Sequence, residues 1–391
     1  MPVRRGSEAA LPTVKLRVRV TGRHPRFFKK QVLKPERPIE PGSLVFVLDK
    51  LGRAVGTGFY NPRSTITVRM LTRSKDTFDR SGIVGLLRNA IRYRERTLGL
   101  GKNENAYRCV HAEGDGLPGL ILDRLGDTYV AQVFALGIVP SLEDIGNELL
   151  SRREGARLVL RVDNDARRLE GIRESETGRV PPGELVEDGL RYRFTPGEGH
   201  KTGFFCDQRE NRKRLGELAR GRRVLDLCCN GGGFAMHAVR GGAKNVLAID
   251  LDEEVVELAR RNLARNDLRA EVAHGDAFDV LRERGKDFDC IVLDPPKWIH
   301  GDGDYESGLQ RYLDANRLAF EALRPGGLLL TCSCSGSLSE ERFLAMLRDA
   351  AARANKDVRL LEICGAGPDH PVALECPETR YLKAVFCEVR A

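Results

Sequence analysis

The segment Val224-Leu-Asp-Leu-Cys-Cys-Asn-Gly-Gly-Gly-Phe234 decides the fold of the C-terminal half of this chain. Its apolar first half predicts a buried strand, and its three glycines predict a tight turn into a helix that continues to Arg240. After residue 199, apolar runs alternate with helical patterns, which predicts a mostly parallel sheet covered by helices on both faces. The strands expected in this sheet are Val224–Cys228, Asn245–Asp250, Glu271–His274, Phe288–Leu293 and Gly327–Cys332.

Acidic residues mark four of these strands: Asp226, Asp250, Asp276 and Asp294. The carboxyl ends of parallel strands meet at the edge where open α/β sheets bind ligands, and a carboxylate at the place of Asp250 can accept from ribose hydroxyls. The loop Asn230–Phe234 lacks Lys and Arg and does not follow the G-x-G-x-x-G spacing, which disfavours phosphates and dinucleotides. S-adenosyl-L-methionine, which has no phosphate and carries a positive sulfonium, fits this set. The simpler alternative is a series of turn glycines and helix caps.

Two further strand ends carry rigid or reactive groups. In Asp294-Pro-Pro-Lys-Trp298 the two prolines stiffen the chain, so that Asp294 is presented to a planar substrate, and Trp298 either stacks on a base or fills a gap. In Leu330-Thr-Cys-Ser-Cys-Ser-Gly336, Cys332 and Cys334 point to the same side of a strand. Cys334 is nearer the carboxyl end, where its thiol can act as a nucleophile, whereas Cys332 is expected only to pack.

The first 195 residues follow a different pattern. Short β-rich runs predict a small β-barrel domain over residues 1–75, a mixture of helix and hairpin patterns predicts a central α+β domain over residues 76–195, and residues 196–391 form the Rossmann-like domain. Residues 1–80 contain 18 Lys and Arg but only 6 Asp and Glu. This excess favours a polyanionic partner for the first domain, although a solvated basic face is the alternative.

The composition excludes several other classes of protein. With 41% hydrophobic and 31% charged residues the chain is neither disordered nor membrane-spanning. The start of the chain lacks the apolar stretch of a signal peptide, so a cytoplasmic protein is expected. None of the ten cysteines shows the paired spacing of a zinc site, so no metal is expected.

Taken together, the motifs resemble those of the bacterial 23S rRNA cytosine-5 methyltransferases, in which a PUA domain and a small α+β domain precede a Rossmann-like methyltransferase domain. The stretches that carry the resemblance are Arg23–Pro25, Glu113–Leu120, Lys201–Arg209, Asn230–Phe234, Asp294–Trp298, Arg311–Asn316, Thr331–Gly336 and Asp369–Pro371. The resemblance implies an RNA-binding first domain with ribosomal RNA as partner, and it places Phe204 or Gln208 near the methionine part of S-adenosyl-L-methionine. The predicted cofactor site then comprises Phe204, Gln208, Asp226, Asn230, Gly231, Gly232, Asp250, Asp276, Ala277 and Asp294.

The chemistry implied by the resemblance is methylation of cytosine at C5. Cys334 would bond to C6 of a base that has left its stack, and Asp294 would hydrogen-bond that base near N3 or N4. Two alternatives remain open: an N-methyltransferase acting on guanine or adenine, which needs no cysteine, and a non-catalytic RNA-binding assembly factor. The sequence leaves the target nucleotide open, and it is compatible with a monomer or a homodimer.

Overall fold

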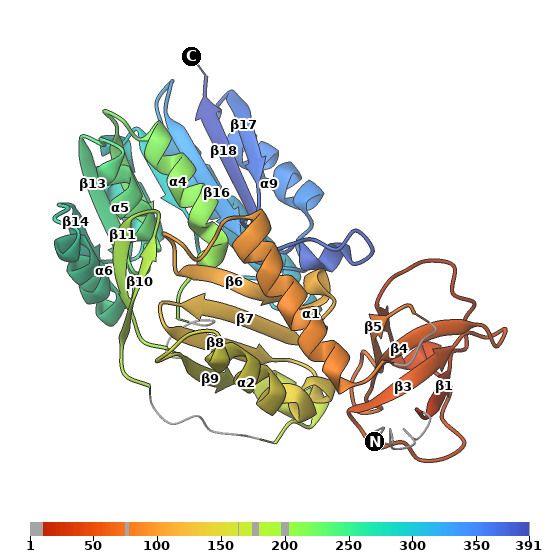
Figure 1. Cartoon of the computed structure of the whole chain (residues 1–391). Coiled ribbons are helices and arrows are strands. Elements are labelled where there is room, and N and C mark those ends of the chain that lie inside the picture. The colour runs from red at the N-terminus through yellow and green to blue at the C-terminus, as the bar shows by residue number, and fades with distance from the viewer. Residues whose placement is uncertain (1–10, 75–77, 163, 174–179, 197–202, 391) are drawn as a thin grey trace.

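The computed structural model describes residues 11–74, 78–162, 164–173, 180–196 and 203–390. They form a five-stranded, a four-stranded and a seven-stranded sheet, together with one separate hairpin (Figure 1). The N-terminal sheet stands at one end of the molecule, whereas the central sheet lies beside the C-terminal one. None of the helices in the described ranges is long and apolar enough to cross a membrane.

The C-terminal sheet has the strand order β14-β13-β12-β15-β16-β18-β17. Its five parallel strands are β12 (Arg223–Leu227), β13 (Asn245–Asp250), β14 (Glu271–His274), β15 (Cys290–Leu293) and β16 (Leu328–Ser333). Side chains alternate between the two faces of a strand, so Val224 enters one apolar core and Leu225 the other. The helices α4 (Arg209–Leu218), α5 (Gly233–Arg240) and α6 (Glu253–Arg265) contribute to the first core, and α7 (Ala277–Arg284), α8 (Tyr305–Ala322) and α9 (Glu340–Arg353) to the second. The predicted α/β architecture is confirmed.

The sequence analysis assigned no strand after Cys332, and the structure adds two. The strand β18 (Lys383–Val389) lies antiparallel between β16 and β17 (Val358–Cys364). Most side chains of β17 are exposed or half-buried, because this strand forms the edge of the sheet. An edge strand buries too few residues to produce a clear apolar pattern, which is why it was missed.

The central domain is built around the sheet β6-β7-β8-β9. Its strands are β6 (Ala106–His111), β7 (Leu120–Leu125), β8 (Thr128–Val133) and β9 (Arg157–Arg161), and its helices are α1 (Arg80–Arg92), α2 (Leu142–Ser151) and α3 (Asn164–Glu170). The hairpin β10 (Gly183–Glu187) and β11 (Leu190–Phe194) bridges this domain to the C-terminal one. Val186 N–H donates to Asn105 Oδ1 at 2.6 Å, and Arg191 N–H donates to Asn266 Oδ1 at 2.8 Å.

The N-terminal sheet has the order β1-β3-β4-β5-β2. Its strands are β1 (Thr13–Lys15), β2 (Arg26–Phe27), β3 (Ser43–Leu48), β4 (Ala54–Tyr60) and β5 (Val68–Thr72). The strand expected over Val14–Val20 is wrong in length, since β1 ends at Lys15 and Leu16 forms only an isolated bridge with Val32. The chain bends after Leu16, so its later alternating valines have no partner strand and are only half-buried.

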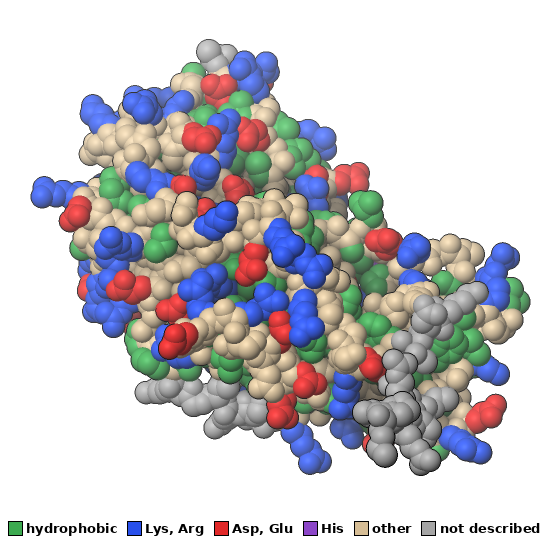
Figure 2. Space-filling model, in the orientation of Figure 1, with side chains coloured by type: hydrophobic (Ala, Val, Ile, Leu, Met, Phe, Trp, Pro, Cys, Tyr) green, Lys and Arg blue, Asp and Glu red, His purple; other side chains and the backbone are tan. Residues whose placement is uncertain are grey.

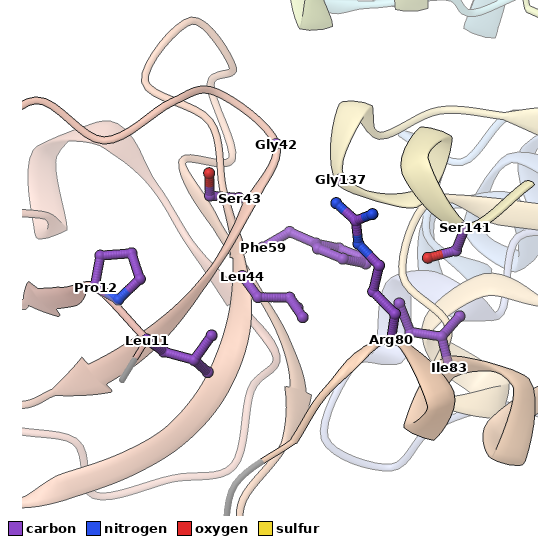
Figure 3. A pocket seen from close by; sticks show the side chains of 10 residues that line it. All are labelled: Leu11, Pro12, Gly42, Ser43, Leu44, Phe59, Arg80, Ile83, Gly137 and Ser141. Carbon is purple, nitrogen blue, oxygen red and sulfur yellow. The ribbon is translucent and has the colours of Figure 1, made fainter. Parts of the chain in front are cut away.

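Buried ion pairs join the N-terminal domain to the central one. Arg69 and Asn61 bond to Glu170 at 3.2 and 2.9 Å, and Arg26 bonds to Glu113 at 2.7 Å. Both glutamates are less than a tenth exposed, so loss of either partner leaves a buried charge unpaired. Beside this contact a cavity of about 280 Å³ lies between the two domains, lined by Leu44 and Phe59 on one side and by Ile83, Gly137 and Ser141 on the other (Figure 3).

Candidate active site

The glycine loop joins β12 to α5 in a strained, close-packed turn. Cys228, Asn230 and Gly232 all have positive φ, at 60°, 47° and 80°. Asn230 Oδ1 accepts from the N–H of Gly231 at 2.7 Å, which stabilises the left-handed turn locally. A Cβ on Gly232 would lie 3.2 Å from the Cβ of Ala259 on α6, so the loop is held against that helix and leaves its other side for a ligand.

Asp250 at the end of β13 supports this loop directly. Its Oδ2 accepts from the N–H of Asn230 at 2.9 Å, and its Oδ1 accepts from the N–H of Asp252 at 3.1 Å. Each carboxylate oxygen has two lone pairs, so Asp250 keeps acceptor capacity for a bound hydroxyl. Asp276, after β14, caps α7 by accepting from Phe278 and Asp279 N–H through Oδ1, and Ala277 is the first residue of that helix. The helix-cap role, which was the simpler alternative from the sequence, therefore involves one oxygen of Asp276, Oδ1.

Asp226 lies deeper than the other acids, inside the strand that the sequence predicts over Val224–Cys228. It is inside β12, its side chain is fully buried, and its Oδ2 accepts from the N–H of Ala235 in α5 at 2.9 Å. Its Oδ1 is buried without a hydrogen-bond partner in the described structure. Burial, together with the nearby charges of Asp294 and Asp250, raises the pKa of Asp226 to about 8, although the bond from Ala235 lowers it. Asp226 thus fixes the start of α5 from below the loop.

Gln208 lies in the packed interior, and Phe204 is half-buried against the apolar core. The ring of Phe204 stands edge-on to Tyr192 with centroids 5.0 Å apart, and the guanidinium of Arg212 lies 5.1 Å from its centroid. Gln208 is buried, accepts from Asn211 Nδ2 at 2.6 Å and hydrogen-bonds the thiol of Cys332. Gln208 therefore connects α4 to β16.

The two cysteines of β16 occupy different environments. Cys332 is fully buried within the strand, and burial raises the pKa of its thiol well above the ordinary value. The strand ends at Ser333, so Cys334 stands beyond it, half-buried in the loop that leaves the sheet. The alternation that places Cys332 and Cys334 on the same side of a strand therefore does not apply to Cys334. The predicted difference in depth between the two cysteines is present, since Cys332 is buried and Cys334 is half-buried.

The loop after Asp294 is tied to the loop of Cys334. Ser335 Oγ is bonded to the N–H of Ile299 at 3.2 Å and to the hydroxyl of Tyr312 at 3.1 Å. Trp298 packs against Tyr312, with ring centroids 4.7 Å apart, and the exposed guanidinium of Arg311 lies 4.9 Å from its centroid. Trp298 is thus part of an aromatic cluster that fixes this loop, as expected if it fills a gap in the packing.

Lys383 is a neighbour of Cys334 that the sequence analysis missed. It is the first residue of β18, and it is only 3% exposed. Its ammonium donates to the carbonyl of Ser335 at 2.6 Å and to that of Tyr381 at 2.8 Å. Only the pairing of β18 with β16 brings it here, and no local pattern indicates that pairing.

Comparisons with known proteins agree with this geometry. A family model described as S-adenosylmethionine-dependent methyltransferase matches residues 158–384, and one described as a PUA-like domain matches residues 15–73. Ribosomal RNA large subunit methyltransferase I of Tolumonas auensis is 37% identical over 376 residues, covering 93% of this chain and 94% of the relative. The protein of that name from Escherichia coli (strain SMS-3-5 / SECEC) is 33% identical over 379 residues, covering 94% and 96%.

The chain belongs to the S-adenosylmethionine-dependent methyltransferases. A putative SAM-dependent methyltransferase from Streptococcus mutans has the same fold, with a TM-score of 0.79 at 17% identity, covering 97% of this chain and 100% of that one. Another solved putative methyltransferase, complexed with SAH, has a TM-score of 0.78 at 17% identity over the same shares of the two chains. The predictions of a methyltransferase, of S-adenosyl-L-methionine as its cofactor and of a PUA-like domain are confirmed.

The charges around the loop of this methyltransferase fit a cationic cofactor. Burial raises the pKa of the Cys228 thiol far above its ordinary value, and the carboxylates of Asp250, Asp294, Asp226 and Asp276 raise it further. Asp250, Asp294 and Asp276 therefore bring negative charge to one point beside the glycine loop, whereas Asp226, whose pKa is raised to about 8, is protonated at pH 7. A positive sulfonium is stabilised where negative charge converges, and a phosphate is not.

The surface of the methyltransferase shows no single basic stripe on the face drawn in Figure 2. Lys and Arg side chains lie over all three domains there and are mixed with Asp and Glu. The N-terminal excess resides in exposed side chains of the PUA-like domain such as Lys29, Lys30, Lys34 and Lys50.

Proposed function

We propose that this methyltransferase forms 5-methylcytosine in 23S ribosomal RNA, with Cys334 as its nucleophile. The observation that carries this proposal is the position of Cys334, a half-buried thiol beyond the carboxyl end of β16, in a loop tied to that of Asp294 through Ser335. The relatives named ribosomal RNA large subunit methyltransferase I support RNA of the large subunit as the substrate. Such a substrate favours the cytoplasm as the site of action.

The cofactor supplies a methyl group on positively charged sulfur. We assign ribose recognition to Asp250, the adenine end to Asp276 and Ala277, and the methionine end to Asn230, Gly231 and Gly232. Asp226 and Gln208 support these contacts from beneath, and Phe204 fixes Arg212 behind the loop. The negative charges of Asp250, Asp276 and Asp294 beside the glycine loop support these assignments.

The thiolate of Cys334 adds to C6 of the flipped cytosine, and the electron pair of the C5–C6 double bond moves to C5. Asp294 hydrogen-bonds the base near N3 and N4 and favours this addition. C5 would then bond to the methyl carbon while the bond from that carbon to the sulfonium sulfur breaks, so that S-adenosyl-L-homocysteine would leave. Loss of the C5 proton and cleavage of the bond from Sγ to C6 then restore the aromatic base and release Cys334.

The test uses RNA that contains 5-fluorocytosine. Fluorine at C5 cannot leave as a proton, so the wild-type protein should stay covalently bonded to the RNA, and the modified peptide should contain Cys334. Cys334→Ala should form no adduct and lose turnover while it keeps its cofactor affinity. The matched control, Cys332→Ala, removes a thiol of the same strand and should cost on the order of 1 kcal/mol of stability but retain turnover.

Full activity of Cys334→Ala, or an adduct on another residue, would exclude this mechanism. An N-methyltransferase would give methylated guanine or adenine and no adduct, and an assembly factor would give neither product. Nucleoside mass spectrometry of the treated RNA separates these outcomes.

A further inference from the structure

The ammonium of Lys383 is buried beside the loop of Cys334. Lys383 pairs with Ser333, the residue immediately before Cys334, across the antiparallel strands β16 and β18. Its Nζ donates to the carbonyl of Ser335, the residue immediately after Cys334. The backbone on both sides of Cys334 is therefore held by one residue, and the side chain of that residue carries a positive charge.

This buried ammonium has little compensation from carboxylates. The pKa of Lys383 is lowered to about 8: burial lowers it most, Lys297 lowers it as well, and ionised Cys334 and Glu340 act in the opposite direction. Glu340 Oε2 already accepts from Arg380 at 2.5 Å, so its charge is shared with another cation. A buried charge without a counter-ion is costly. The thiolate of Cys334 is a second source of negative charge that acts on this ammonium.

The other titratable groups coupled to Cys334 do not replace Lys383. Among the described residues, Cys334 acts on Tyr312 and Cys332 as well, and burial raises the pKa of both, which keeps them neutral near pH 7. Lys383 is the buried cation of this group, and Lys297, which is exposed, is a second cation near it. The carboxylates of Asp294 and Asp207 also act on the neighbouring Cys332. Electrostatic attraction is reciprocal, so an ammonium that the thiolate stabilises also stabilises the thiolate.

We propose that Lys383 is the positioning residue of Cys334, and that its ammonium keeps the Cys334 thiol in the reactive thiolate form. The proposal deepens the proposed function and rests on Cys334 as its nucleophile. The carbonyl bond to Ser335 fixes the loop, and the charge replaces the general base that a neutral thiol would need before attack. Lys383 itself touches neither the base nor the methyl group in this scheme.

The test measures alkylation of Cys334 by iodoacetamide in the full-length protein between pH 5.5 and 10, without RNA or cofactor. Fragmentation of the modified peptide separates Cys334 from Cys332. Lys383→Gln keeps a donor for one carbonyl but removes the charge, and Lys383→Arg keeps the charge. The matched control is Lys356→Gln, because Lys356 also donates to a carbonyl, that of Leu323 at 2.9 Å, but belongs to another part of the domain.

The wild-type rate should rise with a midpoint below about 8.5, the ordinary value for a cysteine. In Lys383→Gln the midpoint should move up by about one pH unit or more, and the rate at pH 7 should fall about 10-fold, since one neighbouring charge shifts a pKa by that amount. Lys383→Arg should retain most of the rate, and Lys356→Gln should match the wild type.

Identical profiles for the wild type and Lys383→Gln would overturn the proposal. If Lys383→Gln does not fold, the wild-type profile decides, because a midpoint at or above the ordinary value also overturns it. The assay contains no substrate, so its result is independent of the 5-fluorocytosine test. A shifted profile without an RNA adduct would confirm the ion pair and reject the proposed function, and an adduct with an unshifted profile would do the reverse.

Discussion

Replacement of Asp250 by alanine should separate cofactor binding from folding in a measurable way. The carboxylate accepts from Asn230 N–H at 2.9 Å and from Asp252 N–H at 3.1 Å, and in our proposal it also accepts from the ribose. A hydrogen bond to a charged group contributes roughly 1.5–3 kcal/mol. Loss of the ribose contact should therefore weaken binding of S-adenosyl-L-methionine about 10- to 150-fold. Loss of the two backbone contacts should lower stability by about 1 kcal/mol each.

Isothermal titration with S-adenosyl-L-methionine measures the affinity, and thermal unfolding measures the stability. Asp252→Ala is the matched control, because Asp252 is exposed and caps α6 through the N–H groups of Glu254 and Val255. This control should lose about 1 kcal/mol of stability and keep the wild-type affinity. An affinity of Asp250→Ala within twofold of the wild type would refute the assignment of the ribose to Asp250.

Two further predictions concern RNA binding and pH. Replacing the exposed Lys29, Lys30 and Lys34 by glutamine should reduce the slope of log affinity for rRNA against log salt concentration by about 0.7–0.9 per lost phosphate contact, at unchanged cofactor affinity. Filter binding at several salt concentrations measures this slope. An unaltered slope would mean that these lysines only form a solvated face. Burial raises the pKa of Asp226 from 3.8 to about 8, so the folded protein holds a proton that the unfolded chain has lost, and stability falls as pH rises between these values. Asp226→Asn keeps an acceptor for Ala235 and does not titrate. Its unfolding temperature should therefore rise relative to that of the wild type as pH increases toward 8. A difference in unfolding temperature that stays constant with pH would contradict this.

Local patterns were sufficient for most of the fold. The alternation of apolar runs and helices predicted the parallel sheet, and the bounds of Asn245–Asp250 and Glu271–His274 agree with β13 and β14. β13 is buried along most of its length and its apolar run indicates this, whereas β14 lies at the edge of the sheet and buries only Val272. In contrast, β18 takes its place from pairing with β16, a contact between segments far apart in the chain, and no periodicity records such a contact.

The sequence predicted the order of the site's acidic residues along the chain, but not how deeply each side chain is buried. The sequence places Asp226 within one apolar strand and Asp250 at the end of another, and it predicts both as residues of the cofactor site. Only the three-dimensional structure shows that one carboxylate is fully buried under α5 while the other reaches the loop. Lys383 was not predicted for the same physical reason as β18. Its position near Cys334 depends on the pairing of β18 with β16 in the folded sheet.

The place of β18 also has a consequence for synthesis on the ribosome. Ser333 and Lys383 pair although they are 50 positions apart, so β16 emerges long before the strand that covers its edge. Domains fold in order of their emergence, and the N-terminal units are complete while this edge still exposes unpaired backbone groups. A nascent chain that has reached only residue 382 therefore lacks both the closing strand and the cation beside Cys334. Interrupted translation products should therefore be prone to aggregate through the unpaired edge of β16. In our proposal their Cys334 thiol should also be unreactive, so that its reactivity depends on completion of the polypeptide.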